Sequence, residues 1–227
     1  MPGPDFSSSP KLLAWKQQVT DAGCMVSAIE PLHILHKKNG SLLFALLKAE
    51  VISAEGTRLP DIIFIRGDAC LIVPLIRNRD TGEERFLMIR QRRIGSGMMS
   101  LEFPAGMLDD ETGNPRGVAA RELAEETGIE APETELFPLC RRKLFSSVGA
   151  SDEGIFYYGC VRDLDDAAYR TLAGRRGGNP DEEEHIQVVL MTREEAINEA
   201  SSGQVRLGLY LFEEYLNRPG ASAADGL

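Results

Sequence analysis

The sequence predicts an α/β fold in which a mixed β-sheet is packed between helices. Apolar runs of strand length are interspersed with helical patterns along most of the 227 residues. One segment carries strong helix signals at both of its ends, and an Asn-Gly pair indicates a hairpin near the N-terminus. With 43% hydrophobic residues, the chain can bury one large core, or one core and a small appended element.

The N-terminal part is expected to form a helix followed by a hairpin. Apolar residues within 11–20 suit a short helix, and two apolar runs within 24–51 flank Asn39-Gly40, the strongest short hairpin signal. The next strands are expected at 61–66, 69–76 and 86–90, with a short apolar stretch at 101–103.

The clearest helix is expected between Asn114 and Gly128. Asn114 can cap its N-terminus, Pro115 fits the first helical position, and Gly128 can end it. Strands are then expected at 136–144, 154–161 and 186–191, with a polar stretch between the last two. A capping box of Thr192 and Glu195 begins another helix, and 205–216 suits a final amphipathic helix.

The amino-acid composition argues against several classes of function. No apolar run approaches the roughly 18 to 20 residues of a membrane helix, and the N-terminus lacks a signal-peptide pattern, so we expect a cytoplasmic protein with no membrane partner. The net charge of −10 argues against nucleic acid as a partner. Four widely spaced cysteines and three scattered histidines suggest neither disulfides nor a His-rich metal site.

Three carboxylates gather near the end of the clearest helix. Glu122 and Glu126 are four residues apart and project from one helix face, and Glu125 lies beside them. Arg121 offsets only part of their mutual repulsion. Hard oxygen ligands in such a cluster suit Mg²⁺ or Mn²⁺, while the alternative is a solvated acidic face.

The pattern Arg-Glu-apolar-x-Glu-Glu-x-Gly-apolar over 121–129 resembles the motif of the Nudix hydrolase family, and Gly106 supplies the Gly that begins it. Gly106 to Arg121 spans 15 positions where the usual motif spans 14, and Glu111 lies one position early for the mid-motif Glu. We interpret this difference as a loop insertion. The run EFPAGMLDD over 102–110 and the longer loop resemble the ADP-ribose and ADP-sugar pyrophosphatase branch, ADP-sugar diphosphatases in particular.

The resemblance implies a Nudix α/β/α sandwich over 61–217, preceded by an N-terminal helix and β-strand extension in 1–60 that forms a homodimer. Residues 218–227 are expected to be a flexible tail. The implied activity is hydrolysis of the pyrophosphate of a nucleotide sugar, such as ADP-glucose or ADP-ribose, to a nucleoside monophosphate and a sugar phosphate. The alternatives are a UDP- or GDP-sugar pyrophosphatase and a nucleotide-sensing Nudix domain without catalysis.

The resemblance also assigns metal and catalytic roles. Glu122, Glu126 and the backbone carbonyl of Ala105 are expected to hold Mg²⁺ or Mn²⁺, and Glu125 is expected to ligate a metal or orient Glu126. In the acidic segment 181–184, Glu182 is expected to be the general base and Glu184 a metal ligand. Glu183 replaces either neighbour if the alignment shifts by one residue.

Substrate contacts are expected from Arg93, Met107 and Glu153. A guanidinium suits bidentate phosphate recognition, which is the role implied for Arg93. Val148 stands where ADP-ribose enzymes of this branch carry a Pro, which favours other nucleotide sugars. Phe44 or Phe64 can stack on the base, and the sequence does not choose between them.

Overall fold

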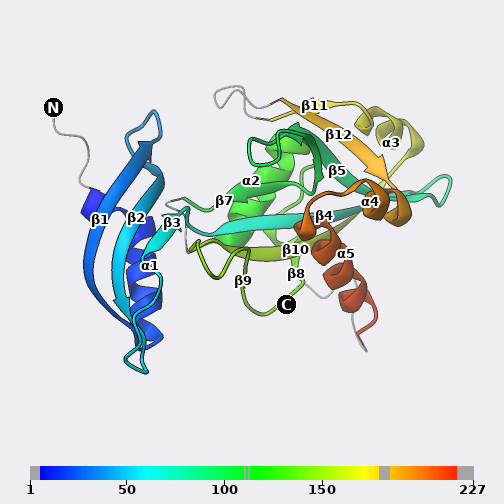
Figure 1. Ribbon diagram of the computed structural model, residues 1–227. Helices are drawn as coiled ribbons and strands as arrows, with labels where there is room; N and C mark the ends of the chain where they lie inside the picture. Colours follow the sequence, from blue (N-terminus) through cyan, green and yellow to red (C-terminus); the bar gives the residue numbers. More distant parts are fainter. Residues whose placement is uncertain (1–5, 110, 112, 179–184, 219–227) are drawn as a thin grey trace. The chain divides into compact units, whose positions relative to one another are not determined.

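A computed structural model describes residues 6–109, 111, 113–178 and 185–218 (Figure 1). The chain forms two compact units. It crosses between them within β4 (Ala69–Asn78), β7 (Ala105–Met107) and β10 (Gly154–Leu164), and also at 113/114 and 142/143. The first unit comprises 1–69, 107–113 and 143–155, and the second comprises 70–106, 114–142 and 156–227. The domain boundaries expected after residues 60 and 217 stay a prediction.

The first unit is a three-stranded antiparallel sheet with a helix packed against it. The sheet has the order β1-β2-β3, and Gly40 turns between β1 and β2 with φ 88°. The predicted hairpin is therefore confirmed. The elements of this unit are η1 (Phe6–Ser8), α1 (Pro10–Asp21), β1 (Met25–His36), β2 (Leu42–Ile52), β3 (Ile62–Ile65) and the short β9 (Leu144–Phe145), which pairs with the start of β10.

The core of the first unit lies between α1 and the sheet. Leu12 and Trp15 of α1 are almost fully buried against alternate residues of β2, such as Leu47 and Ala49. This alternation along β2 is what a strand with one covered face requires.

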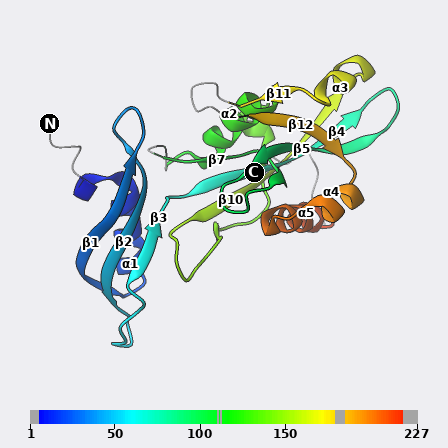
Figure 2. The same cartoon turned by 45° about the horizontal axis from the view of Figure 1, so that its top comes forward.

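The second unit is built on a larger sheet with the order β11-β12-β5-β4-β10-β8, where β6 also pairs with β5 and β7 with β4 (Figure 2). Nearly every residue of β4 is buried, which requires cover on both faces of the sheet. The strands are β4 (Ala69–Asn78), β5 (Glu84–Arg92), β6 (Met99–Glu102), β7 (Ala105–Met107), β8 (Phe137–Pro138), β10 (Gly154–Leu164), β11 (Arg176–Gly177) and β12 (Ile186–Met191).

Helices supply that cover. On α5, Gly208 packs beside Val73 of β4 and Phe103, and Phe212 meets the ring of Phe86 edge-on at 5.6 Å. None of the helices in the described residues is long and apolar enough to cross a membrane. The helices are α2 (Pro115–Thr127), η2 (Glu133–Glu135), α3 (Asp166–Leu172), α4 (Arg193–Glu199) and α5 (Gly203–Leu216). The predicted α/β sandwich is confirmed.

One expected strand was wrong. The predicted strand over 136–144 is divided into β8 and β9. Seven positions separate Pro138 from Phe145, whereas only four separate their partners Tyr158 and Gly154 on β10, so the pairing cannot be continuous. The polar stretch expected between β10 and β12 also contains the short helix α3, which was not predicted and which Asp165 caps by accepting the N–H of Ala168.

Candidate active site

The helix α2 forms where the sequence predicts it. Asn114 accepts the N–H of Gly117 at 3.0 Å, Pro115 occupies the first turn, and Gly128 ends the helix with φ 73°. Val118 and Leu123 are completely buried, which fixes the rotation of the helix about its axis. The carboxylates of Glu122 and Glu126 are thereby held in fixed directions.

Glu122 and Glu126 converge on the residues around β7. The side chain of Glu126 is only 3% exposed, and its Oε2 accepts the backbone N–H of Ala105 at 3.1 Å. A Cβ on Gly106 would lie 2.2 Å from the carboxyl carbon of Glu122, so only glycine leaves room for that carboxylate. Ala105, Glu122 and Glu126, which the sequence assigns to one metal site, therefore lie together.

The surroundings of this carboxylate cluster carry net negative charge. Burial raises the pKa of the nearby Cys70 thiol to about 12, and the charges of Glu122 and Glu126 add to the effect. Arg121 lies at 3.9 Å from Glu122 and at 4.0 Å from Glu125. One exposed guanidinium shared at these distances offsets little of the charge of three carboxylates.

The chemistry of this donor set fits Mg²⁺ or Mn²⁺. Two carboxylates and the carbonyl of Ala105 are hard oxygen donors, and these metals bind a few such groups together with substrate phosphates. Within the described ranges, no three His, Cys, Asp or Glu side chains are grouped as a cation site. Glu182, Glu183 and Glu184 lie outside the described residues.

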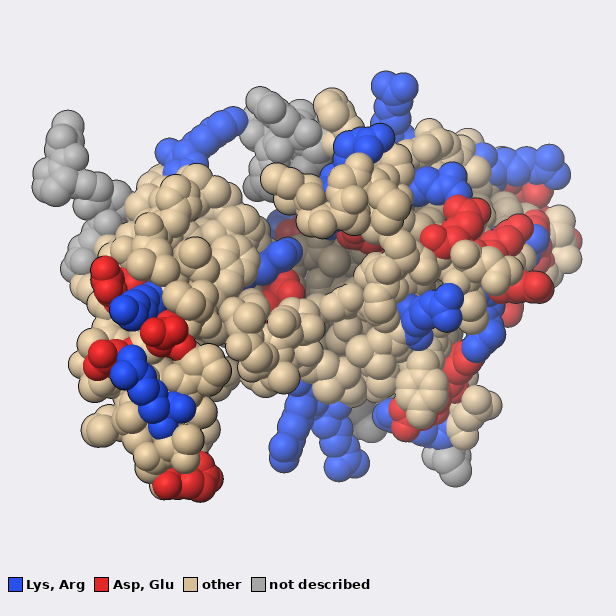
Figure 3. Space-filling view, viewed as in Figure 1, with Lys and Arg blue, Asp and Glu red and all other residues tan. Residues whose placement is uncertain are grey.

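A cavity of about 1010 Å³ adjoins α2 in the second unit. This volume is at the upper end of the range found for small-molecule sites. Its lining combines Glu125 with the cations Arg90, Arg175 and Arg176, and also includes His185 and Gln187. On the face drawn in Figure 3, Lys and Arg are interspersed with Asp and Glu, so three arginines around one cavity are a local concentration of positive charge.

The predicted substrate contacts are engaged with other protein groups. Arg93 makes a bidentate contact with Glu102, with Nε and Nη2 at 3.0 Å and 2.7 Å from its two carboxylate oxygens. Glu153 forms an ion pair with Arg66 at 2.7 Å and accepts a hydrogen bond from Ser146. Met107 ends β7 and is half-buried. Their roles toward substrate stay predictions.

The two candidate stacking residues contact each other. The rings of Phe44 and Phe64 lie 5.4 Å apart in the first unit, and Lys11 and Arg66 lie over the Phe44 ring.

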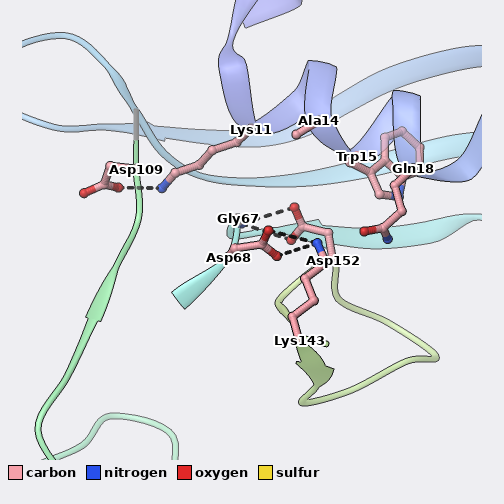
Figure 4. A pocket seen from close by; sticks show the side chains of 9 residues that line it. All are labelled: Lys11, Ala14, Trp15, Gln18, Gly67, Asp68, Asp109, Lys143 and Asp152. Carbon is pink, nitrogen blue, oxygen red and sulfur yellow. Dashed lines mark hydrogen bonds and ion pairs between the residues drawn. The ribbon is translucent and has the colours of Figure 1, made fainter. Parts of the chain in front are cut away.

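Asp109, in the loop after β7, is the centre of an ion-pair network in the first unit (Figure 4). Its carboxylate lies 2.9 Å from Lys11 Nζ and 2.6 Å from Lys37 Nζ. Lys11 is only 3% exposed and also donates to the carbonyl of Leu43. Burial alone would raise the pKa of Asp109, but the two lysines outweigh it and lower the pKa.

A comparison with known protein families identifies the family of the chain. Residues 67–208 match the model of the NUDIX domain, and this segment contains both β7 and α2. The chain belongs to the Nudix family.

Individual Nudix proteins resemble the chain to different extents. The "Nudix hydrolase 14, chloroplastic" of Arabidopsis thaliana is 30% identical over 193 residues, which is 82% of this chain and 61% of that protein. The "ADP-sugar pyrophosphatase" of Mus musculus is 37% identical over 71 residues, 31% of this chain and 32% of that protein. The chain thus spans less than two thirds of either relative.

A solved structure shares the fold. The crystal structure of an "ADP compounds hydrolase" superposes with a TM-score of 0.59 at 18% identity, and the match covers 88% of this chain and 97% of that one. At this identity the likeness establishes the Nudix fold alone.

The arginines around the cavity were not foreseen from the sequence. Arg175 and Arg176 are neighbours in the chain, but Arg90 stands in β5, far away in the sequence, and no local pattern links it to them. The one signal for this arrangement in the sequence is Gly177, because a glycine within a strand often marks a place where another backbone approaches closely.

Proposed function

We propose that this Nudix protein hydrolyses the pyrophosphate of a nucleotide sugar to a nucleoside monophosphate and a sugar phosphate. The observation that carries the proposal is the convergence of Glu122, Glu126 and Ala105. Glu126 is a carboxylate at 3% exposure, and burying a charge is costly unless a cation or hydrogen bonds compensate it. The N–H of Ala105 is one such hydrogen bond, and a metal cation held by Glu126, Glu122 and the carbonyl of Ala105 would compensate the charge directly.

The proposed roles in this reaction are metal binding and proton transfer. Glu122, Glu126, the carbonyl of Ala105 and Glu184 would hold Mg²⁺ or Mn²⁺, and Glu125 would ligate the metal or orient Glu126. A bound metal of this kind neutralises phosphate oxygens and lowers the pKa of the attacking water. Glu182 takes the proton of that water. The new bond joins the water oxygen to phosphorus, the bridging P–O bond breaks, and one phosphate monoester leaves.

An ADP-sugar is the proposed substrate class. The segment 102–110 supports it, because it resembles the ADP-sugar branch, and the names of the mouse relative and of the solved structure point the same way. Val148 in place of Pro favours ADP-glucose over ADP-ribose. Arg93, Met107 and Glu153 are proposed to contact this substrate.

A substrate panel tests the proposal. The full chain would be incubated with Mg²⁺ and ADP-glucose, ADP-ribose, UDP-glucose or GDP-mannose, and both products would be quantified by chromatography. We expect the highest kcat/KM with an ADP-sugar. A preference for UDP-glucose or GDP-mannose would refute the assignment of the base, and hydrolysis of none of the four would refute the proposed activity.

We also propose that the protein forms a homodimer and is located in the cytoplasm. The strand β1 exposes large apolar side chains, with Met25 at 61%, Leu32 at 47% and Leu35 at 46%. Light scattering of wild type and Leu32→Glu would test the dimer, which we expect to weaken in the variant. The name of the Arabidopsis relative places that protein in the chloroplast, so imaging of the tagged chain is the test of location.

A further inference from the structure

We propose that Arg175 and Arg176, which line one cavity together with Glu125, bind the phosphate groups of the substrate. The inference deepens the proposed function and rests on it for the identity of the ligand. It is carried by the contacts that fix β11 against α2, by the place of both arginines in the lining of the cavity, and by the lack of carboxylate partners for them in the described part of the chain.

The backbone of β11 lies directly against the carboxylate-bearing end of α2. A Cβ on Gly177 would come within 1.7 Å of the backbone oxygen of Glu126, a distance that no side chain tolerates. The N–H of Gly178 also points to the carbonyl of Glu125 at 3.3 Å. Gly177 therefore faces α2. Because successive side chains of a strand alternate, Arg176 faces the other side of the sheet, where its cross-strand neighbours Gln187 and Arg90 also lie.

On its other side, β11 is anchored to β12. Arg176 pairs with Gln187 and Gly177 with Ile186, and the N–H of Val188 donates to the carbonyl of Arg175 at 2.8 Å. The backbones of both arginines are therefore held against β12. A fixed backbone leaves less conformational freedom to lose when the side chains bind a ligand than a loose loop does.

Arg175 lies at the C-terminal end of α2. Its guanidinium carbon is 2.1 Å from where a Cβ of Gly128 would be, so the group covers the glycine that ends the helix. The C-terminal end of a helix carries partial negative charge, which favours a cation there. This contact keeps one positive group at the end of α2.

The charges around the cavity leave these two arginines available for an anion. Arg90 lines the same cavity but forms an ion pair with Glu199. Arg175 and Arg176 are exposed, and neither forms an ion pair with any described residue. In a protein of net charge −10, two such guanidinium groups beside Glu125 suit a phosphate ester or diphosphate, which they can grip bidentately.

A binding measurement tests the site without turnover. The probe is α,β-methylene-ADP, whose bridging carbon replaces the hydrolysable oxygen, titrated calorimetrically in Mg²⁺ into wild type, Arg175→Gln, Arg176→Gln and the control Arg141→Gln. Arg141 is an exposed arginine of the same unit that does not line the cavity. We expect roughly tenfold weaker binding for each of the first two variants and unchanged binding for the control.

Steady-state kinetics separate substrate binding from catalysis. We expect Arg176→Gln to raise KM roughly tenfold while kcat changes little, because the contact is made in both ground and transition states. Thermal melts check that each variant folds. We expect them to fold, because the replaced side chains are exposed. Probe affinity and KM that are both unchanged in Arg175→Gln and Arg176→Gln, or wild type that does not bind the probe, would overturn the site.

The same data distinguish failure of the site from failure of the proposed function. A wild type that binds the probe through Arg176 but cleaves no nucleotide sugar would retain the phosphate site and refute the activity. A wild type that cleaves ADP-glucose with the same KM as both variants would retain the activity and refute the site.

Discussion

The backbone N–H of Ala105 donates to Oε2 of Glu126 at 3.1 Å, which joins two parts of the candidate site that are 21 residues apart. The carbonyl of Ala105 is proposed to bind the metal. The hydrogen bond therefore sets the position of the Glu126 carboxylate relative to that carbonyl. Gly106, the next residue, makes room for Glu122. The short strand β7 therefore organises both carboxylates of α2.

The first prediction concerns the space beside Gly106. Gly106→Ala places a Cβ 2.2 Å from the carboxyl carbon of Glu122 and must displace that side chain. We expect kcat with ADP-glucose to fall at least tenfold, because displacement of catalytic groups by about 1 Å costs one to two orders of magnitude. The matched control is Gly113→Ala, since a Cβ there meets nothing within 4 Å. Equal kcat in both variants would refute the role of Gly106.

The second prediction concerns the contact of β11 with α2. Gly177→Ala introduces a Cβ 1.7 Å from the Glu126 carbonyl oxygen, and the strand and helix must separate. Overpacking of this kind costs about 1 to 3 kcal/mol in the free energy of unfolding, measured by urea denaturation. Gly203→Ala, where a Cβ meets no atom within 4 Å, should change stability much less. A neutral Gly177→Ala would show that β11 is not packed on α2.

The third prediction concerns the Lys11–Asp109 ion pair. Asp109→Ala leaves the ammonium of Lys11, 3% exposed, without its carboxylate, whereas Lys11→Met leaves Asp109 paired with Lys37. We therefore expect Asp109→Ala to be the more destabilising variant, by about 2 kcal/mol or more. Chemical denaturation of both variants measures the difference. The opposite ranking would contradict the burial of Lys11.

The fourth prediction concerns the pH dependence of that pair. Because the two lysines lower the pKa of Asp109 below its ordinary value of 3.8, the charged carboxylate stabilises the fold above that pH. The stabilisation is lost as the pH falls through the lowered pKa. The stability difference between wild type and Asp109→Asn should therefore be largest at neutral pH and shrink below pH 3.8. A difference that stays constant from pH 7 to pH 3 would argue against the pairing.

The fifth prediction concerns a buried thiol. Burial raises the pKa of Cys160 to about 12, so almost no thiolate is present at pH 8. Ellman's reagent should leave Cys160 unmodified in the native protein and modify it after unfolding, as mass spectrometry of peptides would show. Rapid modification of Cys160 in the native protein would mean that this side chain of β10 is not buried.

Local signals in the sequence were sufficient for α2, the hairpin and the capping box. Each depends on residues close together in the chain, such as Asn114 and Gly117, or Thr192 and Glu195. The convergence of Ala105 with Glu122 and Glu126 was inferred from the family motif, because spacing alone allowed a solvated acidic face.

Long-range features were not accessible in this way. The division of the predicted strand at 136–144 depends on how many residues of β10 lie opposite it, which pairing alone determines. The placement of Gly177 against Glu126 depends on the docking of β11 on α2, and that of Lys11 beside Asp109 on the packing of the first unit. No periodicity in the sequence encodes such contacts.

The most direct test of the proposed activity is a comparison of Glu126→Gln with Glu130→Gln in Mg²⁺-dependent hydrolysis of ADP-glucose. Glu126 is buried against β7, whereas Glu130 is exposed just beyond the end of α2, and both changes remove one charge without altering size. If Glu126 holds the metal, its variant should lose at least a hundredfold in kcat and the Glu130 variant should match wild type. Equal turnover by all three proteins would contradict the account.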